Sequence, residues 1–307
     1  MISVVIPVFN EEKNIKPMYK KIKSALKKIK GKHEIIYVDD GSSDNTFKEL
    51  SSIHKKDKML KAIRFQRNYG KATALAAGFE KAKGDIIVTM DGDLQDEPEE
   101  MRKLIKKLDG GYGLVTGWKQ AKHKGSLRRV PSRIFNLMAR RLTHLQIHDF
   151  NCPFKAYKAD AAKGLCLYGQ MHRYIPALVK WQGYDVAEVP VLNYERLHGT
   201  TKYSSGRILK GFLDLITVKY LMSYKTSPLY LFGSLGIGMG FFGLIIAAYL
   251  SVLWFLGQKI GDRPLLMLAV LLIILGIQLG SIGLIGEMTT YNAEKSGKNY
   301  SIRDELG

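Results

Sequence analysis

Short apolar runs alternate with amphipathic stretches along the first third of the chain. Four runs rich in β-branched residues are typical of buried strands: ISVVIPV, HEIIYVDD, LKAIRF and DIIVTMDGD. Between them, residues 12–29, 45–55 and 71–83 place apolar side chains at helical spacing. Strands that alternate with helices, and that are apolar almost throughout, predict an α/β fold with a doubly wound, mostly parallel sheet covered on both faces.

Two much longer apolar runs lie near the C-terminus. Neither 229–256 nor 264–286 contains a charged residue, and as helices they would reach about 42 and about 34 Å. A bilayer core is about 30 Å thick, so the sequence predicts two transmembrane helices, about 229–256 and 264–288, joined by the loop GQKIGDR. A buried helical hairpin in a soluble protein is the alternative, and two runs this apolar and glycine-rich argue against it. We expect the glycines of the first run to serve close helix packing.

The charge distribution changes at the same boundary. The chain has 47 Lys and Arg against 28 Asp and Glu, a formal net charge of +19. Five basic and five acidic residues lie in 229–307, so the whole positive excess lies in 1–228. A basic region beside membrane spans favours anionic lipid as a partner and the cytoplasmic side as its location. No aromatic and basic recognition motif accompanies this charge, so nucleic-acid binding is not expected.

The region between the α/β pattern and the spans, 117–228, is basic and less regular. Residues 126–145 carry apolar side chains among five arginines, and 206–225 lead into the first span. We expect both stretches to be amphipathic helices in the membrane interface, although an ordinary surface helix is the alternative for the first. No signal peptide is expected. Cys152 and Cys166 lack metal-ligand spacing and are expected to be buried free thiols.

Polar residues follow each predicted strand at its carboxyl end, where parallel α/β sheets bind ligands. In VDDGSSDNT, Gly41 permits a tight turn, and one of Ser42, Ser43 and Asp44 is expected to cap the next helix. That leaves the acids before Gly41 available to accept hydrogen bonds from a base or a ribose hydroxyl.

The strongest chemical signal is the acidic stretch TMDGDLQDEP, residues 89–98. Asp91 and Asp93 flank a glycine after a predicted strand, and two carboxylates there can face a divalent cation. Hard oxygen ligands suit Mg²⁺ or Mn²⁺, which commonly hold substrate phosphates as well. A solvated turn is the alternative, and the position after a strand of the α/β pattern favours the cation. Asp96 and Glu97 are expected to begin the following helix, where acids suit the helix dipole.

The order of the motifs resembles that of family 2 glycosyltransferases: VVIPVFNEE, VDDGSSDNT, RNYGKATALAAGF, GDIIVTMDGDLQDEP, NCPFKAYK and ERLHGTTKY, then two apolar spans. Within the family the chain is similar to the polyprenyl-phosphate glycosyltransferases, relatives of dolichol-phosphate mannose synthase and of bacterial undecaprenyl-phosphate sugar transferases. The resemblance covers essentially the whole chain. It implies a GT-A type fold and the transfer of one hexose-type sugar from a UDP- or GDP-sugar to a polyprenyl phosphate.

The resemblance also implies a set of site residues. The nucleotide-sugar-binding positions are Pro7, Phe9, Asn10, Glu11, Val38, Asp40, Asn68, Lys71, Met90, Asp91, Gly92, Asp93, Gln95 and Lys119. The metal positions are Asp91, Asp93 and Gln95, and the lipid-phosphate positions are Lys119, Arg129, Ser132 and Arg133. The implied catalytic residues are Asp93, Arg133, Arg196 and Lys202. Phe9 replaces a more usual tyrosine, and Lys119 replaces a common arginine, which makes a bidentate phosphate contact a point-charge one.

The implied reaction is a single displacement with inversion, giving a β-linked product from an α-linked donor. A divalent cation would neutralise the departing nucleoside diphosphate, and the lipid phosphate, already an oxyanion, would need no general base. Residues 1–228 would form a cytoplasmic GT-A catalytic domain, 229–290 the transmembrane region and 291–307 a cytoplasmic tail. A homo-oligomer, either a tetramer or a dimer, is also implied.

Two other functions stay open at this point. A processive polysaccharide synthase would carry Q-x-x-R-W, whereas residues 170–174 read QMHRY, and two spans are few for threading a polymer. A non-catalytic membrane scaffold with the same fold need not retain both carboxylates and the basic loop together. The histidines outside that loop are expected to be surface or packing residues, among them His33, His54, His144, His148 and His172, while His198 lies within it.

Overall fold

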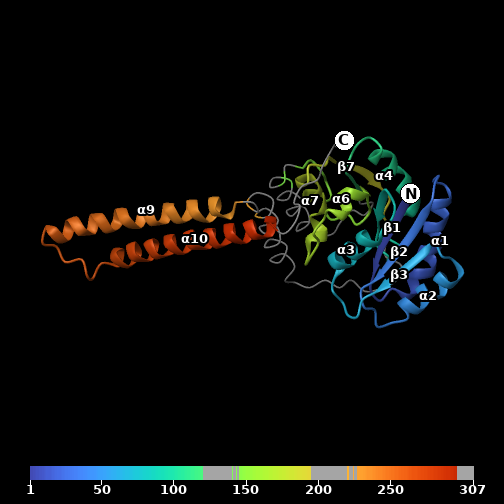
Figure 1. Cartoon of the computed structure of the whole chain (residues 1–307), viewed down its shortest axis with the longest axis horizontal. Coiled ribbons are helices and arrows are strands. Elements are labelled where there is room, and N and C mark those ends of the chain that lie inside the picture. Colours follow the sequence, from blue (N-terminus) through green and yellow to red (C-terminus); the bar gives the residue numbers. More distant parts are fainter. Residues whose placement is uncertain are drawn as a thin grey trace. The chain divides into compact units, whose positions relative to one another are not determined.

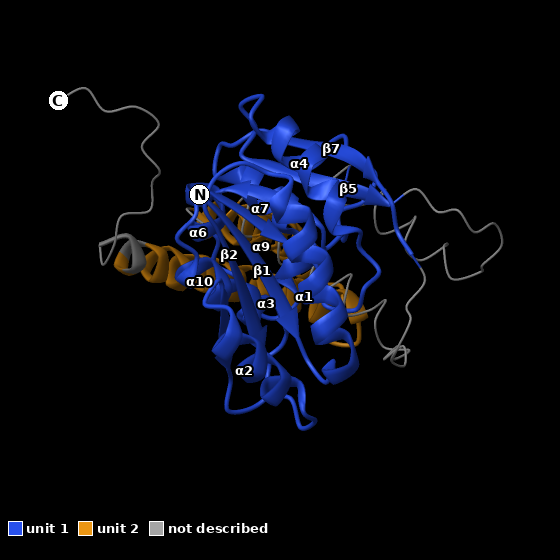
Figure 2. Cartoon of the chain, turned by 90° about the vertical axis from the view of Figure 1, so that its right-hand side faces the viewer, with its two compact units in different colours: residues 1–219 blue, residues 220–307 orange. Residues whose placement is uncertain are grey.

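The structure, a computed structural model, describes residues 1–119, 140, 143, 145–194, 220, 224 and 227–295. The chain divides into two compact units, Met1–Lys219 and Tyr220–Gly307 (Figure 2). The first contains the α/β fold, and the second contains the two long apolar helices.

The first unit is built on one seven-stranded sheet (Figure 1). Its strands are β1 (Ile2–Val8), β2 (His33–Asp39), β3 (Leu60–Arg64), β4 (Ile86–Thr89), β5 (Leu114–Lys119), β6 (Lys155–Lys158) and β7 (Val186–Val191). Their order is β3-β2-β1-β4-β6-β5-β7. Only β6 runs antiparallel to its neighbours, β4 and β5, so the mostly parallel sheet is confirmed. The first four strands are those that the apolar runs predict, whereas β6 and β7 lie in the region without regular alternation.

Helices cover both faces of this sheet, as predicted. One face carries α1 (Glu12–Lys27), α2 (Thr46–Lys56), η1 (Pro98–Glu100) and α4 (Met101–Leu108); the other carries α3 (Lys71–Lys81), α6 (Ala159–Lys163), η2 (Met171–Arg173) and α7 (Ile175–Trp181). Alternate residues of β1 serve the two faces. Val4 and Ile6 join the core under α1, whereas Val5 faces α3, where a Cβ on Gly78 would lie 2.3 Å from Val5 Cγ1. The sheet is therefore buried on both sides.

The chain changes direction across the sheet at β1. β2 pairs with one edge of β1, and β4 pairs with the other. In open α/β sheets, the crevice between such strands lies outside their carboxyl ends and is where ligands bind. The fold thus places the segments after β1 and β4 next to each other at the carboxyl edge of the sheet.

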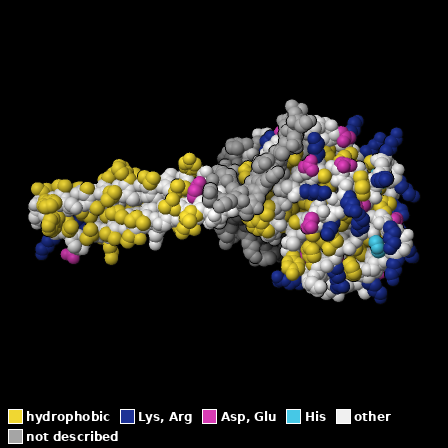
Figure 3. Space-filling model, viewed as in Figure 1, with side chains coloured by type: hydrophobic (Ala, Val, Ile, Leu, Met, Phe, Trp, Pro, Cys, Tyr) yellow, Lys and Arg dark blue, Asp and Glu magenta, His cyan; other side chains and the backbone are white. Residues whose placement is uncertain are grey.

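The second unit contains α9 (Pro228–Phe255) and α10 (Pro264–Lys295). Both are long and apolar enough to cross a membrane, and only 17% and 11% of their most apolar stretches are buried. A core helix of a soluble protein would be mostly buried, whereas these helices present an almost continuous apolar surface (Figure 3). α10 continues to Lys295, beyond the expected end near 288, because neither Gly nor Pro interrupts residues 287–295.

Glycines allow α9 and α10 to approach each other closely. A Cβ on Gly236 would lie 2.6 Å from the carbonyl oxygen of Gly276, and one on Gly243 would lie 2.9 Å from that of Ala269. A Cβ on Gly238 would meet nothing within 4 Å. The packing role expected for these glycines therefore holds for Gly236 and Gly243 but not for Gly238.

Gly236→Leu is expected to destabilise the helical hairpin, because overpacking a close contact costs about 1–3 kcal/mol. Gly238→Leu is the matched control, since it gains the same helix propensity without a clash. Thermal unfolding of the two full-length variants in the same detergent measures the difference. Equal unfolding temperatures would show that the close approach at Gly236 contributes nothing.

Candidate active site

The segments after β1 and β2 are joined by hydrogen bonds at the edge of the sheet. Asn10 adopts the left-handed conformation with φ 55°, which asparagine tolerates better than most residues. Its N–H donates to Ser42 Oγ (2.9 Å), and its Oδ1 accepts from the Ser43 N–H (2.9 Å). The Glu11 N–H donates to Thr46 Oγ1 (2.8 Å). Two of the predicted nucleotide-binding positions, Asn10 and Glu11, are thereby held against the loop after β2.

Asp40 connects the end of β2 to the start of α3. Its Oδ1 accepts from the Tyr69 N–H (2.7 Å), and its Oδ2 accepts from the Gly70 N–H (2.9 Å). The buried carboxylate thus fixes the backbone just before Lys71, while Asn68 in the same segment is exposed. Each oxygen of this carboxylate keeps a second lone pair that can accept a hydrogen bond from a nucleotide. The contact between Asp40 and a nucleotide stays a prediction.

The other nucleotide positions on β1, β2 and β4 lie close to these groups. Pro7 and Val38 are register partners on neighbouring strands. Val38 and Met90 are fully buried, and Phe9 is partly buried. Gly92 packs against β1, since a Cβ there would lie 2.7 Å from Val8 Cγ1.

The carboxylates of Asp91 and Asp93 follow β4 as predicted. Asp91 Oδ1 lies 2.5 Å from Lys71 Nζ, and Lys71 is the first residue of α3. Asp93 is 3% exposed, and its Oδ1 accepts from the Gln95 N–H (3.2 Å). Leu94 between them has φ 63°, a strained conformation of the kind that clusters at functional sites. The chain therefore turns sharply at the three predicted metal ligands.

These residues fit a divalent ion that also binds substrate. Among the described residues, no three His, Cys, Asp or Glu side chains are grouped to hold a metal by themselves. Asp91 and Asp93 offer two carboxylates, and Gln95 offers an amide oxygen. Magnesium sites of this kind use one or two carboxylates and complete the shell with substrate phosphates and water. Such a cation would share the Asp91 carboxylate with the Lys71 ammonium.

The expectation that Asp96 begins the following helix is wrong. Asp96 is fully buried and forms an isolated β-bridge with Asn193. Its Oδ1 lies 2.7 Å from Lys119 Nζ, and its Oδ2 accepts from the Asp91 N–H at 3.3 Å. A carboxylate is needed here because Lys119 is itself largely buried, with 19% of its side chain exposed.

Glu97, the other acid of this pair, takes the position before η1, which begins at Pro98. Its side chain makes no capping bond but pairs with Lys21 at 3.1 Å. In the preceding loop, Asp44 Oδ1 accepts from the N–H of Thr46, the first residue of α2. The N-cap of α2 is nevertheless Asn45, which makes no side-chain capping bond, so none of the three residues expected to cap this helix occupies the N-cap position.

The pKa values of the buried pair reflect its surroundings. Burial disfavours the charged form of Lys119, but Asp96, together with Cys152 and Asp91, outweighs burial, and the pKa of Lys119 is raised. Burial also raises the pKa of Asp96, with the Lys119 ammonium opposing it. The ammonium expected to meet phosphate is thus already paired, and its contact with either substrate stays a prediction.

Several predicted site residues lie outside the described residues: Arg129, Ser132, Arg133, Arg196 and Lys202. The same holds for His198 and for most of the two amphipathic stretches, 126–145 and 206–225. Their roles stay predictions.

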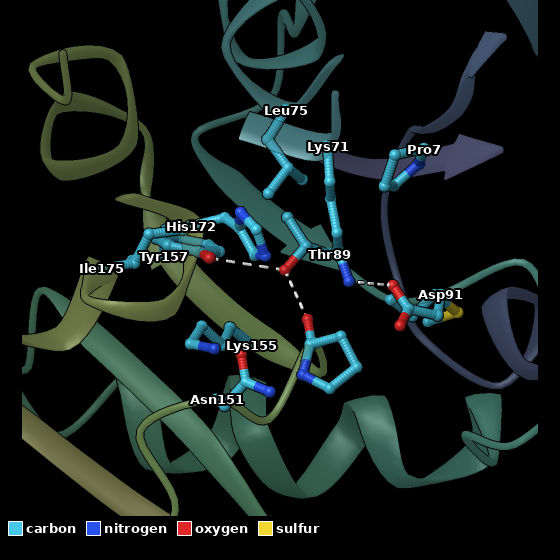
Figure 4. A pocket seen from close by; sticks show the side chains of 12 residues that line it. Pro7, Lys71, Leu75, Thr89, Asp91, Asn151, Lys155, Tyr157, His172 and Ile175 are labelled. Carbon is cyan, nitrogen blue, oxygen red and sulfur yellow. Dashed lines mark hydrogen bonds and ion pairs between the residues drawn. The ribbon is translucent and has the colours of Figure 1, made fainter. Parts of the chain in front are cut away.

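A small pocket beside Asp91 brings in residues that the sequence analysis did not assign to the site (Figure 4). Lys155 and Tyr157 of β6 and His172 of η2 line it together with Lys71. His172 was expected to be a surface or packing residue, and it lines this pocket together with Asp91. A lysine inside the apolar run CPFKAY is the one sequence signal that could have found Lys155. Cys152 is buried as expected, but Cys166 is exposed.

Comparison with known proteins identifies the family of this chain. Residues 3–165 match the profile of Glycosyl transferase family 2. Dodecaprenyl-phosphate galacturonate synthase of Rhizobium johnstonii is 36% identical over 98% of this chain and 92% of that protein. Undecaprenyl-phosphate 4-deoxy-4-formamido-L-arabinose transferase of Pseudomonas aeruginosa is 34% identical over 94% of this chain and 84% of that protein.

Two solved structures share the fold. Glucosyl-3-phosphoglycerate synthase of Mycobacterium tuberculosis, in complex with Mn²⁺ and UDP, has a TM-score of 0.56 at 19% identity, over 72% of this chain and 78% of that one. A mannosyltransferase of Pyrobaculum calidifontis, in complex with GDP-Man and Mn²⁺, has a TM-score of 0.53 at 16% identity, over 98% and 76%.

The chain therefore belongs to glycosyl transferase family 2 and, within it, to the polyprenyl-phosphate glycosyltransferases. It is a glycosyltransferase with a GT-A fold.

Proposed function

We propose that this enzyme transfers one hexose-type sugar from a UDP- or GDP-sugar to a polyprenyl phosphate, with inversion and with a divalent cation. The observation that carries the proposal is the position of Asp91 and Asp93 at the carboxyl end of β4, next to the segment that follows β1. Relatives named for transfer to dodecaprenyl and undecaprenyl phosphate support the acceptor. The complexes of the two structural neighbours support a nucleotide-sugar donor.

Asp91, Asp93 and Gln95 would hold Mg²⁺ or Mn²⁺, which neutralises charge on the leaving nucleoside diphosphate. Lys71 adds a positive charge beside Asp91. An oxygen of the lipid phosphate attacks the anomeric carbon as the bond to the nucleoside diphosphate breaks on the opposite face, which inverts the configuration. The attacking oxygen is already ionised near neutral pH, so no side chain has to remove a proton.

The second unit supplies the means of meeting a lipid acceptor. Two membrane-crossing helices would keep the enzyme where polyprenyl phosphate resides, which raises the effective concentration of the acceptor. The positive excess in residues 1–228 favours a cytoplasmic location for the first unit. The predicted phosphate contacts of Arg133, Arg196 and Lys202 would then complete the site.

A transfer assay with purified protein tests the proposal. Labelled UDP- and GDP-sugars are each incubated with undecaprenyl or dolichyl phosphate and Mg²⁺ or Mn²⁺, and label is measured in the organic phase. We expect label from at least one donor to enter that phase only when acceptor and cation are both present. Label in a long polymer would indicate a processive synthase instead, and the absence of transfer from every donor would support a scaffold.

The two curated relatives differ in the sugar that their names specify. One is named for galacturonate, an acidic sugar, and the other for a neutral formamido sugar. The family therefore leaves the class of sugar open between acidic and neutral.

A further inference from the structure

The pocket beside Asp91 contains a buried cation without an acidic partner. Lys155 has 2% of its surface exposed, and its Nζ donates to the carbonyl oxygen of Cys152. Among the described residues, no carboxylate lies within ion-pair distance of it, whereas Lys71 in the same pocket has Asp91 at 2.5 Å. An ammonium carries three N–H donors, so Lys155 is only partly satisfied.

The charge on Lys155 persists despite its burial. Burial lowers the pKa of Lys155 to about 8, with Cys152, Asp149 and Asp91 opposing that change and Lys71 adding to it. The side chain is therefore mostly protonated at neutral pH. A buried charge is costly unless it is paired, and a bound anion would supply the pair.

His172 adds an unpartnered polar atom to the same pocket. Its Nδ1 is buried without a hydrogen-bond partner among the described residues. Burial, with Lys71 and Arg173 contributing, lowers the pKa of His172 to about 3. The imidazole is thus neutral and can give or accept a hydrogen bond. The Asn151 side chain also lines the pocket (Figure 4).

The size of the pocket limits what can enter it. Its free volume is about 10 Å³, which is room for roughly one water-sized group. A sugar ring does not fit, but one oxygen of a group that projects from the ring does. The donor diphosphate would share the cation held by Asp91 and Asp93, so the sugar is the part of the donor that lies next to the pocket.

We propose that this pocket receives one oxygen of a carboxylate carried by the transferred sugar, with Lys155 as the ion-pair partner of that carboxylate and His172 and Asn151 as hydrogen-bonding neighbours. The donor is then a nucleotide-linked uronic acid. The inference rests on the proposed sugar transfer and narrows its donor to the acidic class.

Matched donors test the inference in the full-length enzyme. UDP-glucuronate is compared with UDP-glucose, UDP-galacturonate with UDP-galactose, and GDP-mannuronate with GDP-mannose; the members of each pair differ only at C6. We expect the acidic member of at least one pair to be transferred with kcat/KM at least about tenfold above that of its neutral counterpart, because only the carboxylate pairs with the buried charge.

The Lys155→Met variant isolates the contribution of the donor carboxylate to transfer. Methionine fills similar volume without charge, so kcat/KM for the acidic donor should fall about 100-fold while that of the neutral donor changes less than about threefold. Lys158→Met, at the exposed end of the same strand, is the matched control and should leave the ratio unchanged. Lys155→Arg should retain the preference, which guards against a folding defect in the methionine variant.

The outcomes distinguish the inference from the proposed function. Transfer of neutral sugars in preference to their acidic counterparts in every pair would overturn the inference and leave the proposed function intact. An equal loss of kcat/KM with the acidic and the neutral donor in Lys155→Met would also overturn the inference, since Lys155 would then bind a phosphate instead of the sugar carboxylate. If the KM for polyprenyl phosphate rose in that variant, the phosphate would be that of the acceptor. Transfer of no sugar at all would instead count against the proposed function.

Discussion

Asp93→Asn is expected to abolish sugar transfer while leaving the protein folded. Asn retains an oxygen that can accept the Gln95 N–H, as Asp93 Oδ1 does now, so the turn after β4 should persist. The change removes one of only two carboxylates that this turn offers to a divalent cation. We expect kcat to fall by more than about 100-fold, because losing groups that merely orient a metal ligand already costs 10- to 100-fold.

The measurement is the transfer rate at saturating Mn²⁺ or Mg²⁺, with thermal unfolding as a check on the fold. Glu97→Gln is the matched control, since Glu97 belongs to the same acidic stretch but pairs with Lys21. That variant should keep its rate within about threefold, because the Glu97 carboxylate is engaged by Lys21 rather than by the proposed cation. Undiminished transfer by the unaltered enzyme in the presence of a chelator would contradict the metal assignment.

The largest effect on stability is expected at the buried pair of Asp96 and Lys119. Asp96→Asn leaves the Lys119 ammonium without its counter-charge, and removing one member of a buried pair costs about 3–5 kcal/mol. For a protein of this size, the unfolding temperature should fall by on the order of 10 °C. Adding Lys119→Met to Asp96→Asn should recover most of that loss, because the uncompensated charge is then gone.

Thermal unfolding in one detergent compares the single and double variants. Glu99→Gln breaks the exposed pair with Lys28, whose side chains are 51% and 58% exposed, and should change stability by less than about 1 kcal/mol. A harmless Asp96→Asn, or a double variant no more stable than the single, would refute the role of the pair. The transfer rate of the stable double variant then reports whether Lys119 also contacts a substrate phosphate.

The elements of the first half follow from local sequence. The β-branched runs that form β1 and β2 remain apolar on both faces, as strands of a covered parallel sheet do. Polar tails after these strands placed Asp91 and Asp93 correctly at the edge. Strand β6 escaped prediction because it is four residues long with lysine at both ends, and its pairing with β4 and β5 outweighs its weak local preference.

The part of the site that could not be predicted depends on contacts distant in sequence. Asp96 looks locally like an acid at a helix start, and only its approach to Lys119 and Asn193 shows why it is buried. His172 lies in a short helical turn without a recognisable motif, and it belongs to the site only because η2 packs near α3. Such roles are determined by the tertiary fold, so no local sequence pattern predicts them.

The antiparallel strand β6 also sets the order in which the sheet can be completed during synthesis. The block β3-β2-β1-β4 has all its strands once residue 89 has emerged, whereas β5 pairs only with β6 and β7. Within the described sheet, β5 therefore has no partner strand until β6 is synthesised, which begins at Lys155, some 36 residues after β5 ends. Unpaired strand edges in growing chains are prone to aggregation. Strand β6, which carries the proposed sugar-selecting lysine, is thus also the strand that joins the two blocks of the sheet. The nascent chain therefore cannot complete the sheet before this lysine has been synthesised.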